Sequence, residues 1–460
     1  MAEVIPFRGI FYNTDMVDSS LVVAPPYDTV TPTFKEVLYA RSPYNIIHVD
    51  LGMDMSGDNE RENRYTRAKK LFNQWLKKGI LISDTRPSFY CYAIDYRINE
   101  EEKRLIGFLG VVKIEELGKG SIRPHEMTYS KPKADRMNIL RFCMANISPI
   151  FSLYSGRKRL TSSILKRVVK GRAFIEAKDE DGFLHRLWKI NDRKSIETIK
   201  EELSDKDIFI ADGHHRYETA LEFRNEMNKV NFLGSLRKGG RGKLQTVNPK
   251  PKPWDYVMMF LANMEDDGLT ILPTHRLIGF KGSRVQAQYL IEGMGRKIEE
   301  LLKPYFEVET ISLNLSDKDT SIEKMFKMMR KSRYSLGMFI RNKRALYVLK
   351  FKGLYSEIDS HQSLKRLDVT ILHELILKRL LRVYRVEYEM DAQAAIEKVN
   401  AIPRPTSRSK AWEGMYHAVF FLNPIRIEDV KKVALAGERM PPKSTYFYPK
   451  LLTGMVIYKF

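Results

Sequence analysis

Several features that mark extracellular, metal-binding or membrane proteins are missing from this 460-residue sequence. It contains only two cysteines, Cys91 and Cys143, which lie far apart and form no CxxC pair, so the sequence supports neither a disulfide framework nor a zinc site. No window approaches the roughly 18 consecutive apolar residues that a membrane-spanning helix needs. The first residues match neither a signal peptide nor a transit peptide. We therefore expect a cytoplasmic protein with reduced core cysteines and no membrane partner.

Several catalytic signatures are missing as well. The sequence has no GxGxxG motif after a strand, no GxSxG motif and no HExxH motif. These absences argue against the common dehydrogenase, α/β-hydrolase and zinc-protease patterns. Gly437 is not followed by a second glycine before Lys443, so the segment Met440–Thr445 (MPPKST) is not a P-loop either.

The sequence has fewer acidic than basic residues. The chain has 57 Asp and Glu against 78 Lys and Arg, and this net charge of +21 favours anionic partners such as phosphorylated metabolites, nucleic acid or a membrane surface. Part of the excess is scattered in pairs such as Lys69-Lys70, which are typical of solvated helix faces. The segment Arg237–Pro253 combines basic residues, glycines and prolines without an acid. It predicts an exposed loop, which either grips phosphate backbones or, as we prefer, is a solvated insertion.

The sequence does contain a mixture of strand and helix patterns. Apolar runs rich in β-branched and aromatic residues predict strands at Ser88–Tyr96, Ile106–Ile114, Asp207–Ala211, Tyr256–Leu261, Ser335–Ile340 and Ala345–Phe351. The clearest helix is Glu62–Lys78, whose apolar residues recur at helical spacing and which ends before Gly79. Further helices are predicted at Thr33–Ala40, Tyr217–Met227, Ser283–Lys303, Ile322–Lys331 and Leu367–Val383. This interspersion predicts an α/β fold of the mixed α+β kind.

The most informative segment is Asp207–Leu221, DIFIADGHHRYETAL. Its pattern predicts a short buried strand, a tight turn at Asp212-Gly213 and a helix from Tyr217 onward. The start of such a helix attracts anions, because its N–H groups and its dipole present positive charge there. The segment therefore predicts an anion site.

The polar side chains of this turn suit phosphate chemistry. Arg216 offers a planar fork to phosphate oxygens, and His214 and His215 can donate hydrogen bonds or carry protons. Asp212 follows the strand, where a carboxylate can hold Mg²⁺. Two alternatives stay open: the histidines bind a transition metal, or Asp212 is a helix cap and Arg216 forms a surface ion pair.

This turn resembles the second signature box of the ParB/sulfiredoxin fold, a Gly-x-x-Arg turn that holds nucleotide phosphates. Gly213, His215 and Arg216 match the sulfiredoxin sequence Gly-Cys-His-Arg. His214 stands where that protein has its cysteine, so the thiol chemistry of sulfiredoxin is excluded.

The first box of that fold is a Pro-containing turn after a strand. Arg123–Glu126 (RPHE) stands upstream of the glycine turn in the matching order. In free serine kinases of this fold, a glutamate in that turn acts as the general base. The resemblance implies this role for Glu126.

The whole chain is also similar to a bacterial family long catalogued as a domain of unknown function, typified by an Ala-Asp-Gly-His-His-Arg box. The matching segments are Ala24–Val30, Asn45–Asp50, Arg123–Thr128, Ala211–Arg216, Ile271–Ile278 and Gly437–Lys450. Some relatives resemble kinases that phosphorylate free L-serine to O-phospho-L-serine, with pyrophosphate or a nucleotide as donor. The resemblance implies a ParB/sulfiredoxin-like core at residues 105–280, an N-terminal α/β segment at 1–104, and a C-terminal α/β domain at 281–460 that carries MPPKST.

The resemblance and the needs of phosphoryl transfer together predict roles for individual residues. Glu126 and His214 are the predicted catalytic residues, and Asp212 is the predicted ligand of the expected cofactor Mg²⁺. The predicted phosphate contacts are Gly213, His214, His215, Arg216, Arg136 and Lys443. The predicted contacts to the substrates, which are L-serine with pyrophosphate, ATP or ADP, are Tyr27, Asp28, Asn45, His48, His125, Thr128, Ser444 and Thr445.

Structural roles are the alternatives for several of these residues. Arg136 could instead pair with Asp135 or Glu126, and His125 could cap a turn. The polar groups of Asn45 and His48 could only satisfy buried backbone groups. For the whole protein, the competing interpretation is a ParB-like protein that binds or hydrolyses a nucleotide and associates with nucleic acid. No helix-turn-helix pattern supports it.

Overall fold

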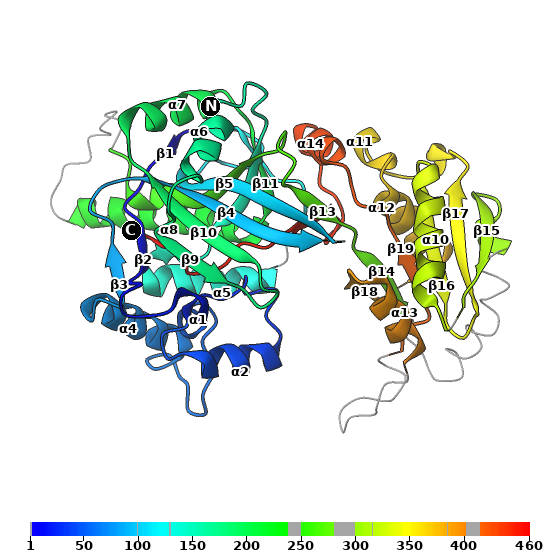
Figure 1. Cartoon of the computed structure of the whole chain (residues 1–460), viewed down its shortest axis with the longest axis horizontal. Coiled ribbons are helices and arrows are strands. Elements are labelled where there is room, and N and C mark those ends of the chain that lie inside the picture. Colours follow the sequence, from blue (N-terminus) through cyan, green and yellow to red (C-terminus); the bar gives the residue numbers. More distant parts are fainter. Residues whose placement is uncertain are drawn as a thin grey trace. The chain divides into compact units, whose positions relative to one another are not determined.

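The computed structural model describes residues 2–98, 100–127, 130–237, 250–279, 300–314, 316–383, 385–401 and 415–460 (Figure 1). The chain forms two compact units. The first comprises Met1–Pro124, Thr128–Thr270 and Phe447–Phe460, and the second comprises His125–Met127 and Ile271–Tyr446. The segment 1–104 and most of the segment 105–280 thus contribute to the same unit.

The first unit is built on a nine-stranded sheet with the order β6-β11-β8-β12-β5-β4-β10-β9, in which β1 also pairs with β5. Its strands are β1 (Val4–Ile5), β4 (Phe89–Ile98), β5 (Glu101–Lys113), β6 (Ile122–Arg123), β8 (Ile150–Tyr154), β9 (Ile175–Lys178), β10 (Leu184–Ile190), β11 (Ile208–Asp212) and β12 (Tyr256–Asn263). Smaller pairs are β2 (Ile10–Tyr12) with β3 (Leu81–Ser83), and β7 (Ala145–Asn146) with β21 (Tyr458–Lys459). β6 and β11 are parallel neighbours, so their carboxyl ends lie toward the same edge of the sheet, while the Arg123 side chain pairs with Asp207 just before β11.

Both faces of this sheet are covered. The helices of the unit are α1 (Ser19–Val22), α2 (Pro32–Arg41), α3 (Ile47–Asp50), α4 (Arg64–Lys77), α5 (Ser130–Cys143), α6 (Leu160–Val168), α7 (Arg193–Ser204), α8 (His214–Arg237) and the 3₁₀ turn η1 (Pro253–Asp255). Leu165 of α6 and Tyr217 of α8 pack in one buried cluster with Cys91 of β4. The next side chain of β4, Tyr92, points to the opposite face, and its hydroxyl accepts a hydrogen bond from the N–H of Leu452. The carboxyl-terminal segment therefore covers that face.

The second unit is built on a six-stranded antiparallel sheet with the order β15-β17-β16-β19-β14-β18. Its strands are β14 (His275–Gly279), β15 (Phe306–Ser312), β16 (Ser335–Ile340), β17 (Ala345–Phe351), β18 (Arg385–Glu389) and β19 (Ala418–Phe421). Its helices are α10 (Lys318–Lys331), η2 (Tyr355–Glu357), α11 (Gln362–Lys365), α12 (Asp368–Thr370), the π-helix η3 (Ile371–Leu380), α13 (Ala392–Asn400) and α14 (Ile427–Leu435). Met325 of α10 and Ile396 of α13 share a buried cluster with Phe339 of β16, so these two helices cover one face. The chain passes between the units within β13 (Thr270–Leu272) and β20 (Tyr446–Tyr448).

The mixed α/β prediction is confirmed. Each of the strands expected from an apolar run is present, as β4, β5, β11, β12, β16 and β17. The helix expected at Glu62–Lys78 is α4, where Asn63 caps the first turn by accepting from the N–H groups of Tyr65 and Thr66. α8 begins at His214 rather than at the expected Tyr217. Most of the helix expected at Ser283–Lys303 and residues 238–249 of the basic segment lie outside the described residues.

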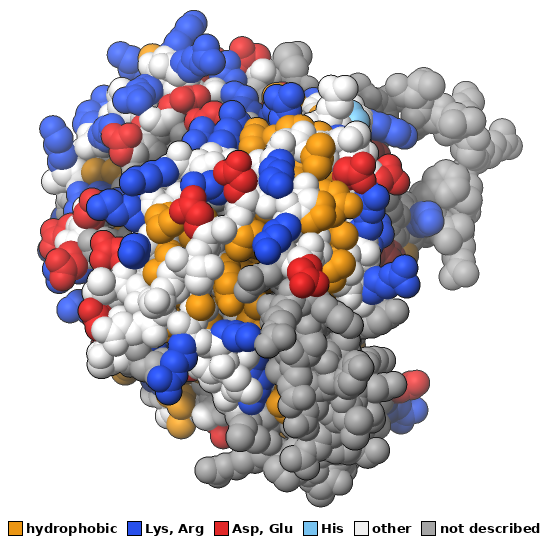
Figure 2. Space-filling view, turned by 90° about the vertical axis from the view of Figure 1, so that its right-hand side faces the viewer, with side chains coloured by type: hydrophobic (Ala, Val, Ile, Leu, Met, Phe, Trp, Pro, Cys, Tyr) orange, Lys and Arg blue, Asp and Glu red, His pale blue; other side chains and the backbone are white. Residues whose placement is uncertain are grey.

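The described part of the chain contains no helix long and apolar enough to cross a membrane. Both cysteines are buried and form no disulfide, as predicted. On the face drawn in Figure 2, Lys and Arg side chains are interspersed with Asp and Glu side chains and do not form one basic stripe. On this face, the pattern matches the solvated surface expected from the scattered lysine pairs.

Candidate active site

The turn after β11 fixes the guanidinium of Arg216. Gly213 has a φ of +93°, a left-handed conformation that favours glycine. A Cβ atom at Gly213 would lie 2.8 Å from Nε of Arg216, so glycine is needed for space as well. Nη1 of Arg216 donates to Oγ of Ser148 at 2.8 Å and to the carbonyl oxygen of Pro149. Nε is buried and has no hydrogen-bond partner among the described residues, which leaves a donor that a bound anion can satisfy.

Two cations share the Asp212 carboxylate at the end of β11. Nη2 of Arg216 lies 3.3 Å from Oδ2 of Asp212, and Nζ of Lys450 lies 3.5 Å from the same oxygen. The exposed side-chain fractions are 11% for Arg216, 17% for Lys450 and 24% for Asp212. The cluster is thus shielded from bulk water yet within reach of a ligand, and it carries one more positive than negative charge.

His214 and His215 lie in the first turn of α8, at the positive end of the helix dipole. His214 is buried and His215 is half-buried. Successive residues of a helix point in different directions, so the two rings do not face one another. Among the described residues, no three His, Cys, Asp or Glu side chains converge as a metal site, so the transition-metal alternative gains no support.

Tyr27 belongs to the same electrostatic neighbourhood. The central carbon of the Arg136 guanidinium lies 4.1 Å from the centroid of the Tyr27 ring. Burial raises the pKa of Tyr27 to about 12, and the charges of Asp28, Arg136, Arg216 and Asp212 contribute smaller effects of both signs. The Tyr27 hydroxyl therefore stays protonated near neutral pH, close enough to the charges of the turn to sense them.

Arg136 is engaged by acids of its own unit. Its Nη1 and Nη2 donate at 2.6 Å to the carboxylate and to the carbonyl oxygen of Asp50, and its Nε donates to Asp135 at 3.0 Å. Only 5% of Arg136 is exposed. The pairing of Arg136 with Asp135 is the alternative that the sequence left open. Because these acids hold the guanidinium in place, Arg136 is suited to position Tyr27.

Asn45 and His48 bind backbone groups. Nδ2 of Asn45 donates to the carbonyl oxygens of Leu21 and Val23 at 2.8 and 3.0 Å, and the residue is fully buried. Nε2 of His48 lies 3.1 Å from the carbonyl oxygen of Ser42. Both residues thus satisfy buried backbone groups, which is the structural role that the sequence left open for them. Their contact with substrate stays a prediction.

Residues from distant parts of the sequence support Arg216. Thr453 exchanges backbone hydrogen bonds of 2.7 and 3.3 Å with Ala24, and its Oγ1 lies 3.2 Å from Oγ of Ser148. Ser148 in turn accepts the hydrogen bond from Arg216. A cavity of about 40 Å³ beside Arg216 is also lined by Asp50, Arg136 and Ser148. It has room for water but not for a nucleotide.

In the second unit, the residues that follow Arg123-Pro124 meet the MPPKST segment. The N–H of Lys443 donates to Oε1 of Glu126 at 3.0 Å, although 317 residues separate them in the sequence. The N–H of Met440 donates to the carbonyl oxygen of His125 at 2.8 Å. Lys443 has a φ of +57°, so it is part of a tight turn rather than a helix or strand. Backbone groups of this turn therefore orient the Glu126 carboxylate.

The hydroxyls of this segment fix the turn. Nε2 of the buried His125 lies 2.9 Å from Oγ1 of Thr445. Oγ of Ser444 donates to the carbonyl oxygen of Pro441 at 2.6 Å. Ser444 and Thr445 are both buried, so these contacts are structural and substrate contacts stay a prediction. Thr128, the remaining predicted substrate contact, lies outside the described residues.

Arg276 lies behind Lys443. It is the largest fully buried side chain among the described residues, and its Nη2 donates to the carbonyl oxygen of Lys443 at 2.9 Å. Its Nε lies 3.4 Å from Nε2 of His373. Burial lowers the pKa of Arg276 to about 10, while the negative charge of Glu126 is among the effects that raise it, and burial lowers the pKa of His373 to about 3. Arg276 therefore stays charged beside a neutral histidine and anchors the turn that orients Glu126.

Four residues of these two clusters are absent from the sequence prediction: Ser148, Arg276, Lys450 and Thr453. Arg276 and Lys450 lie in the matching segments Ile271–Ile278 and Gly437–Lys450, and this was the only signal that could have found them. Ser148 and Thr453 carry no motif, so only the fold reveals their contacts.

Comparison with known proteins gives a family and distant structural likenesses. Among solved structures, a conserved hypothetical protein from Pyrococcus furiosus has a TM-score of 0.31 and 13% identity, with 73% of this chain and 92% of that chain covered. A free serine kinase in complex with AMP has a TM-score of 0.30 and 13% identity, with 75% and 94% covered. A C-terminally truncated SbnI from Staphylococcus aureus has a TM-score of 0.31 and 10% identity, with 75% and 85% covered. No curated protein matches the chain.

The family whose sequence profile matches is described as "Protein of unknown function (DUF1015)". The match extends over residues 4–370, which is well over half of the chain. It includes the Asp212 turn, the RPHE box and Arg276, and it confirms the resemblance inferred from the motifs. The chain therefore belongs to the DUF1015 family.

Proposed function

We propose that this protein is a phosphotransferase that moves a phosphoryl group from pyrophosphate, ATP or ADP to the hydroxyl of a small molecule, with free L-serine as the acceptor. The observation that carries the proposal is the cluster in the first unit, where Arg216 and Lys450 flank Asp212 at the start of α8. Phosphoryl transfer depends mainly on placing charge around the phosphate, and this cluster supplies that kind of charge.

The donor phosphate would bind at the start of α8. Arg216 and Lys450 would contact its oxygens, with Nε of Arg216 as an available donor. Gly213 allows the backbone to approach the phosphate closely, and His214 and His215 would add donors from the first helical turn. Lys443 is proposed as a further phosphate contact, on the strength of its motif alone.

Asp212 would hold Mg²⁺. A single protein carboxylate suits this ion, because bound Mg²⁺ keeps several water molecules and takes its other ligands from phosphate oxygens. When bound, the ion would neutralise charge on the phosphate groups.

Glu126 would accept the proton of the acceptor hydroxyl. The N–H of Lys443 holds one oxygen of its carboxylate, which supports the proposal because a general base must be oriented as well as present. Tyr27 and Asp28 are proposed as further substrate contacts. The acceptor hydroxyl would thus lose its proton to Glu126 as its oxygen attacks the phosphorus atom. The bond from that phosphorus to the bridging oxygen of the donor would break, and phosphate, ADP or AMP would leave from pyrophosphate, ATP or ADP respectively.

The direct test is product formation by the full-length protein. The purified protein is incubated with Mg²⁺, L-serine and, in parallel, pyrophosphate, ATP or ADP, and O-phosphoserine is measured by mass spectrometry. Glu126→Gln should reduce the rate about 10²–10⁴-fold, as loss of a general base does. The exposed Glu323→Gln on α10 is the matched control and should leave the rate unchanged. Absence of phosphoserine with every donor, from folded protein, would overturn the proposal.

The competing nucleic-acid interpretation rests on the net charge of +21 and on the segment Arg237–Pro253, of which residues 238–249 lie outside the described part of the chain. The same experiment separates the two functions. Release of inorganic phosphate from ATP without phosphoserine, together with salt-sensitive binding to duplex DNA, would favour a nucleotide-hydrolysing protein associated with nucleic acid.

A further inference from the structure

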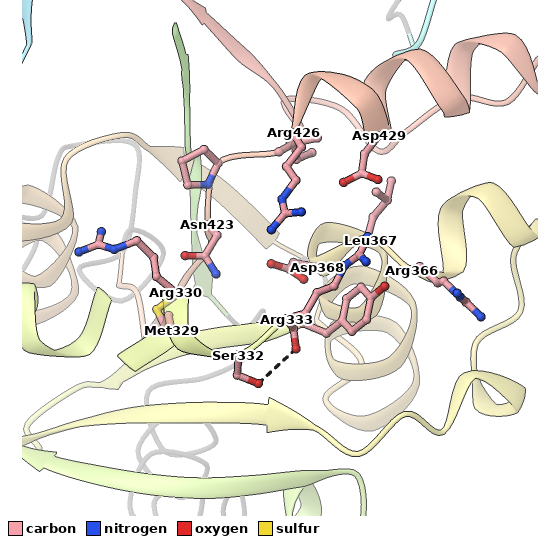
Figure 3. A pocket seen from close by; sticks show the side chains of 13 residues that line it. Met329, Arg330, Ser332, Arg333, Arg366, Leu367, Asp368, Asn423, Arg426 and Asp429 are labelled. Atoms are coloured by element: carbon pink, nitrogen blue, oxygen red, sulfur yellow. Dashed lines mark hydrogen bonds between the residues drawn. The ribbon is translucent and has the colours of Figure 1, made fainter. Parts of the chain in front are cut away.

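The second unit contains a cavity that no residue of the proposed phosphotransfer chemistry lines. Its volume is about 270 Å³. Three segments form it: the end of α10 with the turn that follows, the start of α12, and the connection from β19 into α14 (Figure 3). The lining side chains are Met329, Arg330, Ser332, Arg333, Tyr334, Arg366, Leu367, Asp368, Asn423, Pro424, Ile425, Arg426 and Asp429.

Polar groups converge in this cavity. In Figure 3, the side chains of Asn423, Arg426 and Asp368 point toward one another, and the guanidiniums of Arg330 and Arg366 extend outward on opposite sides. Oδ1 of Asn423 is buried and has no hydrogen-bond partner among the described residues. The arginines are exposed at the rim, and the Asp368 and Asn423 side chains are half-buried within it.

The net charge of the residues that line the cavity is positive. Four arginines and two aspartates line it, so two positive charges remain even when both carboxyls are ionised. In the part of the chain that the structure describes, none of the four arginines lies within 4.0 Å of a carboxylate oxygen, although the charges of Arg333 and Arg426 act on Asp368. Arg333 and Arg366 lie near tyrosine rings, which orient a guanidinium without neutralising it. The guanidinium groups thus remain able to bind an anion.

Asp368 adds a proton-dependent element. Burial raises its pKa to about 7, and repulsion from Asp429 adds to this rise, whereas the hydrogen bond from Asn423 and the charges of Arg333 and Arg426 oppose it. Near neutral pH the carboxyl is therefore partly protonated. In its neutral form it is a hydrogen-bond donor that an anion can accept.

We propose that this cavity is a binding site for a small dianion that carries phosphate or carboxylate groups. Arginine forks match both groups in geometry, and two negative charges balance the charge of the lining. The volume lies just below the range of about 300–1,000 Å³ that is usual for small-molecule sites, which favours a compact ligand. The proposal does not depend on the proposed phosphotransfer activity, because no residue is shared.

The test is local protection on binding. The full-length protein is titrated with pyrophosphate, inorganic phosphate or succinate, and hydrogen exchange is followed in peptides that cover residues 366–377 and 423–435. A phosphate-bearing or a dicarboxylate ligand should protect these peptides, and the ligand that protects at the lower concentration identifies the source of the anion. Arg426→Met should weaken the protection at least tenfold, because it removes one of the four arginines that line the cavity. The variant should fold, because the Arg426 side chain makes no cap hydrogen bond to α14.

Two further variants keep the test specific. Arg344→Met, at an exposed arginine of the same unit outside the cavity, should leave the protection unchanged. Arg216→Met, in the proposed donor site, should also leave it unchanged, so failure of the phosphotransfer proposal can be told apart from failure of this one. Arg330→Met serves as a second cavity variant if Arg426→Met does not fold. No protection by any of the anions at millimolar concentration, or protection that survives both cavity variants, would overturn the inference.

The binding should also depend on pH. For succinate, whose two carboxyls stay ionised across this range, affinity should fall from about pH 6 to about pH 8, because ionised Asp368 repels an anion, and Asp368→Asn should remove this dependence. The other charged groups that face Asp368 in the cavity are Asp429, Arg330, Arg333, Arg366 and Arg426. An affinity that is flat across this range in the wild type would contradict the assignment of Asp368 to the site.

Discussion

Replacing Asp368 by asparagine should stabilise the protein more strongly as the pH rises. Burial raises the pKa of this carboxyl from 3.8 to about 7. Between these values the native chain keeps a proton that the unfolded chain has already released, so the free energy of unfolding falls as the pH rises through this range. A pKa rise of this size corresponds to about 4 kcal/mol in full. Asparagine has a similar shape and cannot ionise, so the unfolding free energy of the variant does not contain this pH-dependent decrease.

The magnitude can be measured by urea unfolding at several pH values. Between about pH 5 and about pH 8, the difference in unfolding free energy between Asp368→Asn and the wild type should grow by about 2–3 kcal/mol. Circular dichroism follows the whole chain, and hydrogen exchange of η3 (Ile371–Leu380) reports on the second unit alone. The exposed Asp359→Asn is the control. Parallel stability curves for wild type and Asp368→Asn would refute the reasoning, because they would mean that Asp368 ionises equally in both states.

Four further predictions concern the proposed chemistry. Glu126→Gln should lower kcat about 10²–10⁴-fold without unfolding the protein, measured as phosphoserine formation. Gly213→Ala should cost about 1–3 kcal/mol in thermal unfolding and raise KM for the donor, because it strains a backbone at φ +93° and displaces Arg216. Lys450→Met should raise KM for the donor, since it removes one of the two cations beside Asp212. Arg276→Met should lower kcat about tenfold, the equivalent of one hydrogen bond, while KM for the donor stays the same, because the turn that orients Glu126 loses an anchor.

Gly213→Ala and Lys450→Met each have a matched control. Gly182→Ala also places a side chain at a positive φ, but with no atom near the new Cβ, so it isolates backbone strain from the displacement of Arg216. Lys324→Met removes an exposed lysine of α10 and should change neither kcat nor KM. A donor KM that is unchanged in both Gly213→Ala and Lys450→Met would contradict the phosphate role of the turn. A decrease in kcat that is as large in Glu323→Gln as in Glu126→Gln would deny Glu126 a specific role.

The sequence alone determined much of the secondary structure and one turn of the site. Apolar runs such as Ser335–Ile340 and Ala345–Phe351 became strands with those bounds, because both faces of a central strand are buried and the pattern is local. The sequence also predicted the strand, the glycine turn and the helix around Asp212. This was possible because a positive φ and the start of a helix depend on residues that are neighbours along the chain. The start of α8 was placed too late, since the N–H of Tyr217 already bonds to the carbonyl oxygen of Gly213 and the helix therefore begins at His214.

Tertiary structure decided which distant residues complete each cluster. Lys450 reaches Asp212, and Lys443 meets Glu126, across 238 and 317 residues of sequence respectively, and no local pattern encodes such pairings. The same holds for the roles of Arg136 and Asn45, which only the fold shows to be bound to a carboxylate and to backbone carbonyls. The cavity around Asp368 could not be predicted from the sequence at all, because its three segments carry no motif. Its arginines and aspartates come together only when these segments are packed against one another. Local propensity is set by neighbours along the chain, whereas charge pairing and burial are set by neighbours in space.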